Sequence, residues 1–368
     1  MKSNFDFLNR YWPALAQIGA TAETYVYSDP NACIYKLGMF AERLVQEILV
    51  FEHIAEPAVD NTHANRIRIL KRAGLLPHEI DNTLYVLRKT RNTAVHTGTD
   101  SVDEAKTLLS LTYNLAVWFM ETYGDWGYIA PEFVMPSETT HEDLESVIAE
   151  QERKIEELTK QLAVVKTAAS GKTQKERARR SESVSAMMNW NEAQTRCLID
   201  EQLRLSGWEA DTQNLRYSKG TRPVKGRNIA ISEWPTNSAF YKNGYADYAF
   251  FVGEKLVALM DAKKMSEDVA STIDVQVKDY AAHIKPEDIP HTVGNWNGYQ
   301  VPFLFASNGR AYLEQLRTKS GIWFLDVREQ ENQPYPIRNW FSPSDLMEKL
   351  GQNTVAANQA LAAADNSF

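Results

Sequence analysis

The chain is 368 residues long, with 43% hydrophobic and 24% charged residues and a formal net charge of −8. This is the composition of a globular protein with room for two or three domains, and it excludes a chain that binds nucleic acid through an overall positive charge. Two widely separated cysteines, no apolar N-terminal signal segment and no apolar run of about 18 residues exclude a disulfide framework, a secreted chain and a membrane span, so we expect a cytoplasmic protein with reduced thiols.

Residues 1–130 are predicted to form an α-helical domain. Apolar residues recur at three- and four-residue steps in 37–54 and again in 105–123, which places them on one face of a helix. No segment in this region shows a clear two-residue alternation. We therefore expect a bundle of about five helices.

Residues 137–185 differ in composition. They are rich in Glu, Lys, Gln, Arg and Ala and contain no aromatic residue. A series of residues from Leu144 to Val165, all apolar except Gln151, follows alternating steps of four and three, but over only about three heptads. The segment is either a solvated spacer helix or a short coiled coil, and both alternatives remain open.

Residues 188–350 show a mixed pattern. A helix is predicted over 191–208, with Gly207 at its end, and another over 271–284. Two strands, 245–253 and 255–264, are joined by a tight Gly-Glu turn, and further strands are predicted over 301–309 and 321–329. We expect an α/β core with a mixed sheet, followed by a polar tail over 351–368.

The second of these strands ends in a group of residues that can carry chemistry. Its sequence "LVALMDAKK" runs from five apolar residues to Asp261 and Lys263, which point to the same face because side chains alternate along a strand. Asp247, on the preceding strand, comes near Asp261 if the two strands pair. Two carboxylates can hold Mg²⁺, and a lysine beside them can position water and stabilise charge on a phosphate. A surface salt bridge is the alternative for the acid–lysine pair alone.

The helix after this strand adds two polar residues. Gln276 and Tyr280 are four residues apart and share a helical face, from which they can hydrogen-bond a phosphate or a water molecule. Glu192, on the helix before the sheet, is a further candidate metal ligand, although a local pair with Arg196 explains it equally well.

These residues carry a specific resemblance. The spacing Asp-…-Asp-x-Lys is that of PD-(D/E)xK nucleases, and 190–345 resembles the nuclease domain of the R subunit of type I restriction enzymes. The matching stretches include "GYADYAFFVGEKLVALMDAKK", "QVKDY" and "VPFLFASNGR". The resemblance implies catalytic roles for Asp247, Asp261, Lys263, Gln276 and Tyr280, with Mg²⁺ as the cofactor. The second acid is Asp261 where this family often has Glu.

A basic loop precedes the first of the paired strands. Cations surround two glycines and a proline in "LRYSKGTRPVKGRN", and they are suited to phosphate contacts: Arg216, Lys219, Arg222, Lys225 and Arg227. Lys264 adds a charge beside the acids. A loop that is merely solvated remains the alternative.

The helical domain contains a second motif. Arg91 and His96 in "LRKTRNTAVH" resemble the R-x₄₋₆-H motif of HEPN domains, some of which are ribonucleases. In such an enzyme His96 would act as acid or base and Arg91 would hold the phosphate. We expect instead a HEPN-like domain for binding or docking, while metal-independent RNA cleavage and a structural role for both residues stay open.

The resemblance to type I enzymes also implies partners. In that family double-stranded DNA is cut without base specificity of the nuclease itself, specificity (S) and methyltransferase (M) subunits read the sequence, and an ATP-driven helicase motor follows the nuclease. This chain contains no G-x-x-x-x-G-K-[ST] motif, so we expect a fragment or truncated product without ATPase activity. A non-catalytic module that binds DNA or a partner is the remaining alternative.

Overall fold

The computed structural model of the chain describes residues 3–56, 60–97, 101–138, 150–155, 157, 167–188, 190–238, 244–265, 267, 269–310, 312 and 317–352. The chain divides into two compact units, Met1–Asn189 and Trp190–Phe368. No helix among these described residues is both long and apolar enough to cross a membrane.

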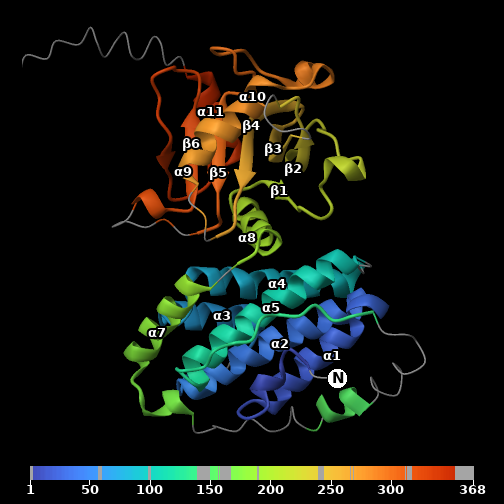
Figure 1. The fold of residues 1–368 in the computed structure, drawn as a ribbon, viewed down its shortest axis with the longest axis vertical. Helices are drawn as coiled ribbons and strands as arrows, with labels where there is room; N and C mark the ends of the chain where they lie inside the picture. The colour runs from blue at the N-terminus through green and yellow to red at the C-terminus, as the bar shows by residue number, and fades with distance from the viewer. Residues whose placement is uncertain are drawn as a thin grey trace, which may run out of the picture. The chain divides into compact units, whose positions relative to one another are not determined.

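The first unit is helical, in agreement with the predicted bundle (Figure 1). Its helices are α1 (Pro13–Ser28), α2 (Pro30–Phe51), α3 (His63–Arg72), α4 (His78–Thr97), α5 (Val102–Phe119) and α7 (Gln174–Met187), with short turns η1 (Asp6–Leu8), η2 (Met120–Gly124) and η4 (Ala168–Gly171). The apolar stripe predicted over 37–54 lies on α2, where Leu37, Phe40 and Leu44 are fully buried. Side-chain caps fix the helix starts: Asp29 accepts a hydrogen bond from the Ala32 amide, and Ser101 accepts one from the Glu104 amide.

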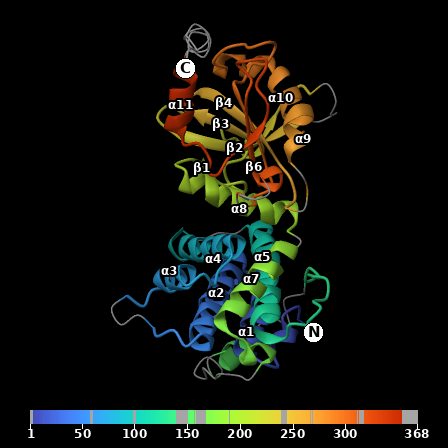
Figure 2. The same ribbon diagram turned by 90° about the vertical axis from the view of Figure 1, so that its left-hand side faces the viewer.

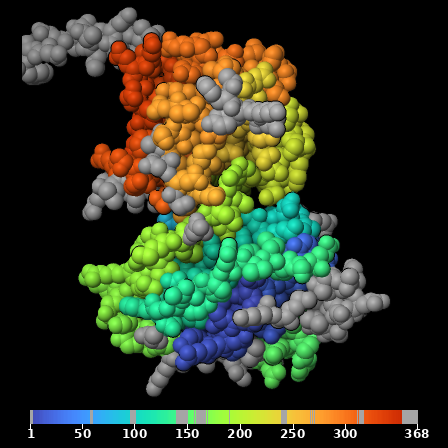
Figure 3. All heavy atoms as spheres, in the orientation of Figure 1, coloured from blue at the N-terminus to red at the C-terminus, as the bar shows by residue number. Residues whose placement is uncertain are grey.

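Helix α7 begins within the segment 137–185, for which a solvated spacer or a coiled coil was considered, and it packs on the bundle. Arg177 forms an ion pair with Glu52 of the α2 end, at 2.5 Å between Nη2 and Oε2, and both side chains are buried. The Trp118 indole donates to the Ser181 hydroxyl at 3.2 Å. In Figure 3 the light-green atoms of α7 lie directly against those of the α5–η2 segment. The residues from Leu144 to Ile148 and from Leu158 to Val165 lie outside the described part.

The second unit is built on one mixed sheet in the order β1-β2-β3-β4-β5-β6-β7. The strands are β1 (Glu209–Ala210), β2 (Asn228–Pro235), β3 (Tyr245–Val252), β4 (Lys255–Ala262), β5 (Phe303–Ser307), β6 (Ile322–Asp326) and β7 (Tyr335–Pro336). Strands β1 and β2, and again β4 and β5, are parallel, and the other neighbours are antiparallel. The predicted hairpin of β3 and β4 is confirmed, with Gly253 in its turn at φ +61°.

Helices cover both faces of this sheet, as Figure 2 shows. One face packs against α8 (Glu192–Leu205) and α11 (Pro343–Gly351), with Tyr248 and Phe250 of β3 directed to it. The other packs against α9 (Ala270–Thr272), the π-helical turn η6 (Ile273–Val277) and α10 (Lys278–Ala282), with Ala249 and Phe251 directed to it. This alternation produces two apolar cores separated by the sheet. The turns η5 (Tyr217–Lys219), η7 (Pro286–His291) and η8 (Arg317–Lys319) lie in the loops.

A buried polar network fixes α8 on the sheet. The Asp200 carboxylate accepts hydrogen bonds from the Tyr248 hydroxyl at 2.8 Å and from the Thr212 amide and hydroxyl at 2.8 Å and 3.0 Å. Burial raises the pKa of Asp200 to about 6, although Arg204 opposes the shift. The Tyr248 hydroxyl also lies 3.3 Å from the Arg196 carbonyl. The helix that carries Glu192 and Arg196 is thereby held over β3.

The Arg177–Glu52 pair predicts a large stability effect. Arg177→Ala leaves the Glu52 carboxylate buried without its guanidinium, so we expect the first unit to lose about 3–5 kcal/mol in urea unfolding. The matched control is Arg179→Ala, on the exposed side of the same helix, which should change the unfolding free energy by less than about 0.5 kcal/mol. Equal effects of the two substitutions would show that α7 does not depend on this ion pair.

His63 predicts a pH dependence. Its side chain is 8% exposed, and neither ring nitrogen has a hydrogen-bond partner among the described residues. Burial, opposed by Glu42, lowers the pKa of His63 to about 4. Below about pH 6.5 the imidazole binds a proton in the unfolded chain but not in the folded one. The contribution of His63 to the free energy of unfolding is therefore complete above that pH and is lost as the pH falls toward 4.

We expect this one group to remove about 3 kcal/mol of stability between about pH 7 and pH 4. The measurement is the pH dependence of urea unfolding for the wild type and for His63→Leu, using the transition that Arg177→Ala shifts. The variant should lose less stability on acidification than the wild type by that amount. Parallel pH profiles would contradict the assignment.

Candidate active site

A cleft of about 490 Å³ opens on the second unit where β3 and β4 meet the η6–α10 segment. It contains the predicted acids, Lys263, Lys264, Gln276 and Tyr280, together with two polar residues that were not predicted. Its lining consists of Glu192, Gly244, Tyr245, Asp247, Asp261, Ala262, Lys263, Lys264, Glu267, Gln276 and Tyr280. Of the polar side chains among these, Tyr245 and Glu267 were not predicted, and Tyr245 is half exposed.

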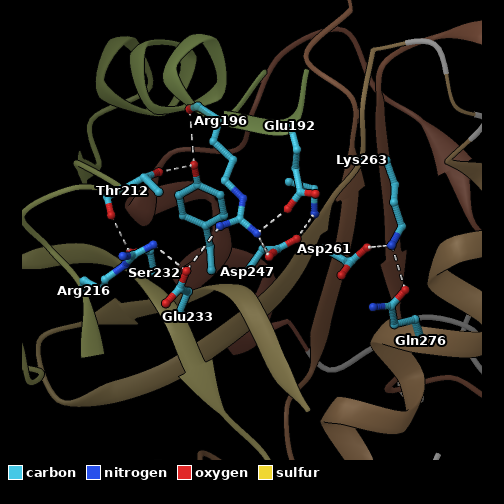
Figure 4. Close-up of polar contacts among 12 residues, drawn as sticks. Glu192, Arg196, Thr212, Arg216, Ser232, Glu233, Asp247, Asp261, Lys263 and Gln276 are labelled. Atoms are coloured by element: carbon cyan, nitrogen blue, oxygen red, sulfur yellow. Dashed lines mark hydrogen bonds and ion pairs between the residues drawn. The ribbon is translucent and has the colours of Figure 1, made fainter. Parts of the chain in front are cut away.

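The two aspartates come from neighbouring strands (Figure 4). Tyr248 pairs with Met260 in the β3–β4 ladder, so Asp247 and Asp261 extend the ladder by one step in the same direction. The Ala262 amide donates to Asp247 Oδ2 at 2.6 Å, which fixes the first carboxylate beside the end of β4. Asp261 is 2% exposed. The register of one hairpin therefore brings the two acids together.

Burial of the pair is electrostatically costly. Burial raises the pKa of Asp247 to about 7, with the neighbouring Asp261 adding to the shift and Arg196 opposing it. Burial also raises the pKa of Asp261, opposed by Lys263. Each carboxylate thus has its own cation, and the pair as a whole retains affinity for further positive charge.

Lys263 is held by three contacts just beyond β4. Its amide donates to the Ser307 carbonyl of β5 at 2.8 Å, and its Nζ lies 2.6 Å from Asp261 Oδ2. Nζ also donates to Gln276 Oε1 at 2.9 Å. Burial alone would lower the pKa of Lys263, but the Asp261 carboxylate outweighs it and raises the pKa, so the ammonium form is stabilised.

Gln276 and Tyr280 share one helical face, as predicted. The Gln276 amide nitrogen donates to the Tyr280 hydroxyl at 2.6 Å, so the tyrosine orients the amide that contacts Lys263. Gln276 lies in the π-helical turn η6, and such turns occur often at functional sites because they redirect side chains. Gln276 and Tyr280 thus orient the Lys263 side chain through two successive hydrogen bonds.

Arg196 lies on the other side of the acids. It is 14% exposed, its Nη2 lies 2.8 Å from Glu192 Oε1, and the same nitrogen contacts Asp247 Oδ1. The expected local pair of Glu192 and Arg196 is therefore present, while Glu192 still lines the cleft. Burial would lower the pKa of Arg196, but Asp247 and the other acids raise it.

Glu233 of β2 is a member of this cluster that the sequence analysis did not identify. It lies between the paired residues Ser232 and Trp234, across from Asp247, and its φ is +54°. A residue with a side chain adopts this backbone region at a cost of about 1 kcal/mol or more, and such strain gathers at functional sites. Its carboxylate lies 3.6 Å from Arg196 Nη1 and 2.5 Å from Arg216 Nη2. The available signal was a single acid in a mostly apolar strand.

The predicted basic loop lies beside this cluster. Two of its arginines are ion-paired, Arg216 with Glu233 and Arg227 with Glu209 at 2.5 Å. Arg222 stacks over the Tyr217 ring at 3.7 Å from its centroid. Lys219 and Lys225 are exposed, as is Lys264 on the cleft.

The HEPN-like motif lies in the first unit. The Arg91 guanidinium contacts Glu42 at 2.6 Å and lies over the Tyr35 ring, and its stem passes so close to Gly38 that a Cβ there would clash. His96 belongs to α4, but its side chain lies outside the described part of the structure. The structure thus places Arg91 in a helix-packing ion pair.

The acids of the second unit are compatible with a divalent cation. No three ligating side chains converge in the described part of the chain. Mg²⁺, however, is commonly bound by one or two carboxylates with water and substrate oxygens completing the shell. Asp261 lines the cleft, and its buried Oδ2 lies 2.6 Å from Lys263 Nζ. Asp247 and Asp261 therefore fit such a cation.

Comparison with known proteins relates the second unit to one family. Residues 209–350 match the profile of the second domain of the type I restriction enzyme EcoKI endonuclease subunit. The chain is 29% identical to the type I restriction enzyme EcoKI endonuclease subunit of Escherichia coli strain K12, in an alignment that covers 97% of the chain and 37% of that relative. No solved structure matches the chain.

The chain thus spans little more than a third of the relative it matches. The matched range contains both strands that carry the acids and every residue that lines the cleft except Glu192. The resemblance predicted from the motifs is confirmed: residues 209–350 are similar to the second domain of a type I restriction endonuclease subunit.

Proposed function

We propose that the second unit is a Mg²⁺-dependent deoxyribonuclease domain that hydrolyses phosphodiester bonds of double-stranded DNA as part of a type I restriction enzyme. The convergence of Asp247, Asp261 and Lys263 in one cleft carries this proposal. The relative's description as an endonuclease subunit supports it.

Each residue has a distinct role in this proposal. Asp247 and Asp261 would hold the cation, which when bound polarises the phosphate and lowers the pKa of a coordinated water. Lys263 is held in its charged form by Asp261, so it can orient the attacking water and stabilise negative charge on the phosphate. Gln276 and Tyr280 keep the lysine in place through their two hydrogen bonds.

The surroundings of the cleft are suited to a backbone ligand. Lys264 lines the cleft, and the exposed Lys219 and Lys225 of the basic loop offer further positive charge. Contacts of this kind bind phosphates without reading bases. Sequence recognition would then come from the S and M subunits, the partners we propose for this chain, and ATP would be needed only by a helicase motor.

Removal of the lysine charge tests the site. We expect Lys263→Ala to lower the rate of Mg²⁺-dependent nicking of a long circular DNA by about 100-fold or more, because charge on the phosphate loses its stabilising cation. The matched control is Lys255→Ala, an exposed lysine at the opposite end of β4, which should cut at the wild-type rate. Chelation of the metal should abolish cleavage in all three proteins.

The outcomes separate the candidate functions. Equal nicking by wild type and Lys263→Ala would show that the assigned cleft is not the nuclease site. Binding of DNA with no cleavage, alone and with the S, M and motor components, would instead indicate a non-catalytic binding module. Metal-independent RNA cleavage that Arg91→Gln abolishes would favour the HEPN-type alternative.

A further inference from the structure

Arg196 is a cation placed among three carboxylates from three different elements. Figure 4 shows its guanidinium between Glu192 of α8, Asp247 of β3 and Glu233 of β2. The contacts to Glu192 and Asp247 are direct, whereas Glu233 lies 3.6 Å away. As the structure stands, this guanidinium occupies Asp247 Oδ1, one of the oxygens that a divalent cation would use.

Glu233 is shared between two arginines. Its Oε1 lies 2.5 Å from Arg216 Nη2 and 3.6 Å from Arg196 Nη1, so the same oxygen faces both guanidinium groups. Arg216 belongs to the basic loop and is 28% exposed, so a ligand phosphate can reach it. The four residues form one continuous chain of charges from the loop to the cleft: Arg216, Glu233, Arg196 and Asp247.

We propose that Arg196 and Glu233 are positioning residues that couple phosphate contact at Arg216 to cation binding at Asp247. This inference rests on the proposed nuclease function. A phosphate that binds Arg216 competes with Glu233 for the guanidinium. The Glu233 carboxylate then interacts with Arg196 alone and draws it from Asp247, which frees Oδ1 for the cation.

The coupling is reciprocal. If phosphate binding favours the cation, the cation must favour phosphate binding by the same factor. In the absence of DNA, Arg196 neutralises Asp247 and lowers its affinity for a divalent ion. The basic loop would thus have two roles. It would hold the DNA, and through Glu233 it would draw Arg196 away from Asp247.

The test measures the affinity of the full chain for a short fluorescent duplex by anisotropy, in Ca²⁺ and in EDTA at matched ionic strength. Ca²⁺ serves as the oxygen-ligand probe, and the coupling is the ratio of the two dissociation constants. We expect the wild type to bind at least about five-fold more tightly with Ca²⁺, at the lower end of usual coupling strengths.

Two variants should remove the coupling. Glu233→Gln deletes the shared charge, and Arg216→Gln deletes the phosphate sensor, so both should give a ratio near one. Lys219→Gln is the matched control from the same loop: it should weaken duplex binding in both buffers but leave the ratio at the wild-type value. Circular dichroism and thermal unfolding verify that each variant is folded.

Failure of the proposed coupling can be distinguished from failure of the proposed nuclease function. The proposed coupling is overturned if folded Glu233→Gln keeps the wild-type ratio of dissociation constants. It is also overturned if the wild type cuts DNA with Mg²⁺ but binds the duplex equally well in Ca²⁺ and in EDTA. Asp261→Asn should abolish the tighter duplex binding in Ca²⁺ whether or not Arg196 and Glu233 couple the two sites. A wild type that shows neither a Ca²⁺ response nor Mg²⁺-dependent cleavage in the assembled enzyme overturns the proposed function itself.

Discussion

The mutual repulsion of Asp247 and Asp261 is the constraint around which the second unit is arranged. Asp261 is buried and Asp247 largely so at the end of one hairpin, and each is held near its own cation, Arg196 or Lys263. The arginine comes from α8 and the lysine follows β4, so the charges approach the acids from opposite sides (Figure 4). Removing either cation would leave an uncompensated carboxylate in a poorly solvated place. Both cations are accordingly fixed by a second polar contact, Arg196 to Glu192 and Lys263 to Gln276.

The sheet supplies the precision that this arrangement needs. A one-residue slip between β3 and β4 would turn every side chain of one strand to the opposite face and separate the acids. The slip is prevented because both faces are buried: Phe250 packs toward α8 and α11, and Phe251 packs toward α10. The parallel pairing of β4 with β5 then holds the Lys263 backbone, so hydrophobic burial on two sides determines the geometry of a polar cleft.

Local pattern was sufficient for the elements that carry the site. The hairpin, helix α8 and the Gln276–Tyr280 step follow from periodicity and turn residues, and the acids follow from their positions on the strands. The strands β1 and β7 have two residues each and show no period, and β2 is interrupted by Ser232 and Glu233. Long-range pairs were equally invisible: Arg177 is buried only because Glu52 lies opposite, and Glu233 is functional in our proposal only because the fold brings two arginines to it.

The hydrogen-bonded group beneath α8 has a consequence for how this domain can diverge. Asp200, Thr212 and Tyr248 come from the helix, a loop and β3, and each satisfies the others in the absence of solvent. Loss of any one side chain leaves buried polar atoms of the other two without hydrogen-bond partners. A single replacement therefore lowers stability, whereas simultaneous replacement of all three by apolar residues is tolerated more easily. These three positions should therefore covary among related domains, and a lineage that exchanges them together would keep α8, with Glu192 and Arg196, in the same register over the sheet.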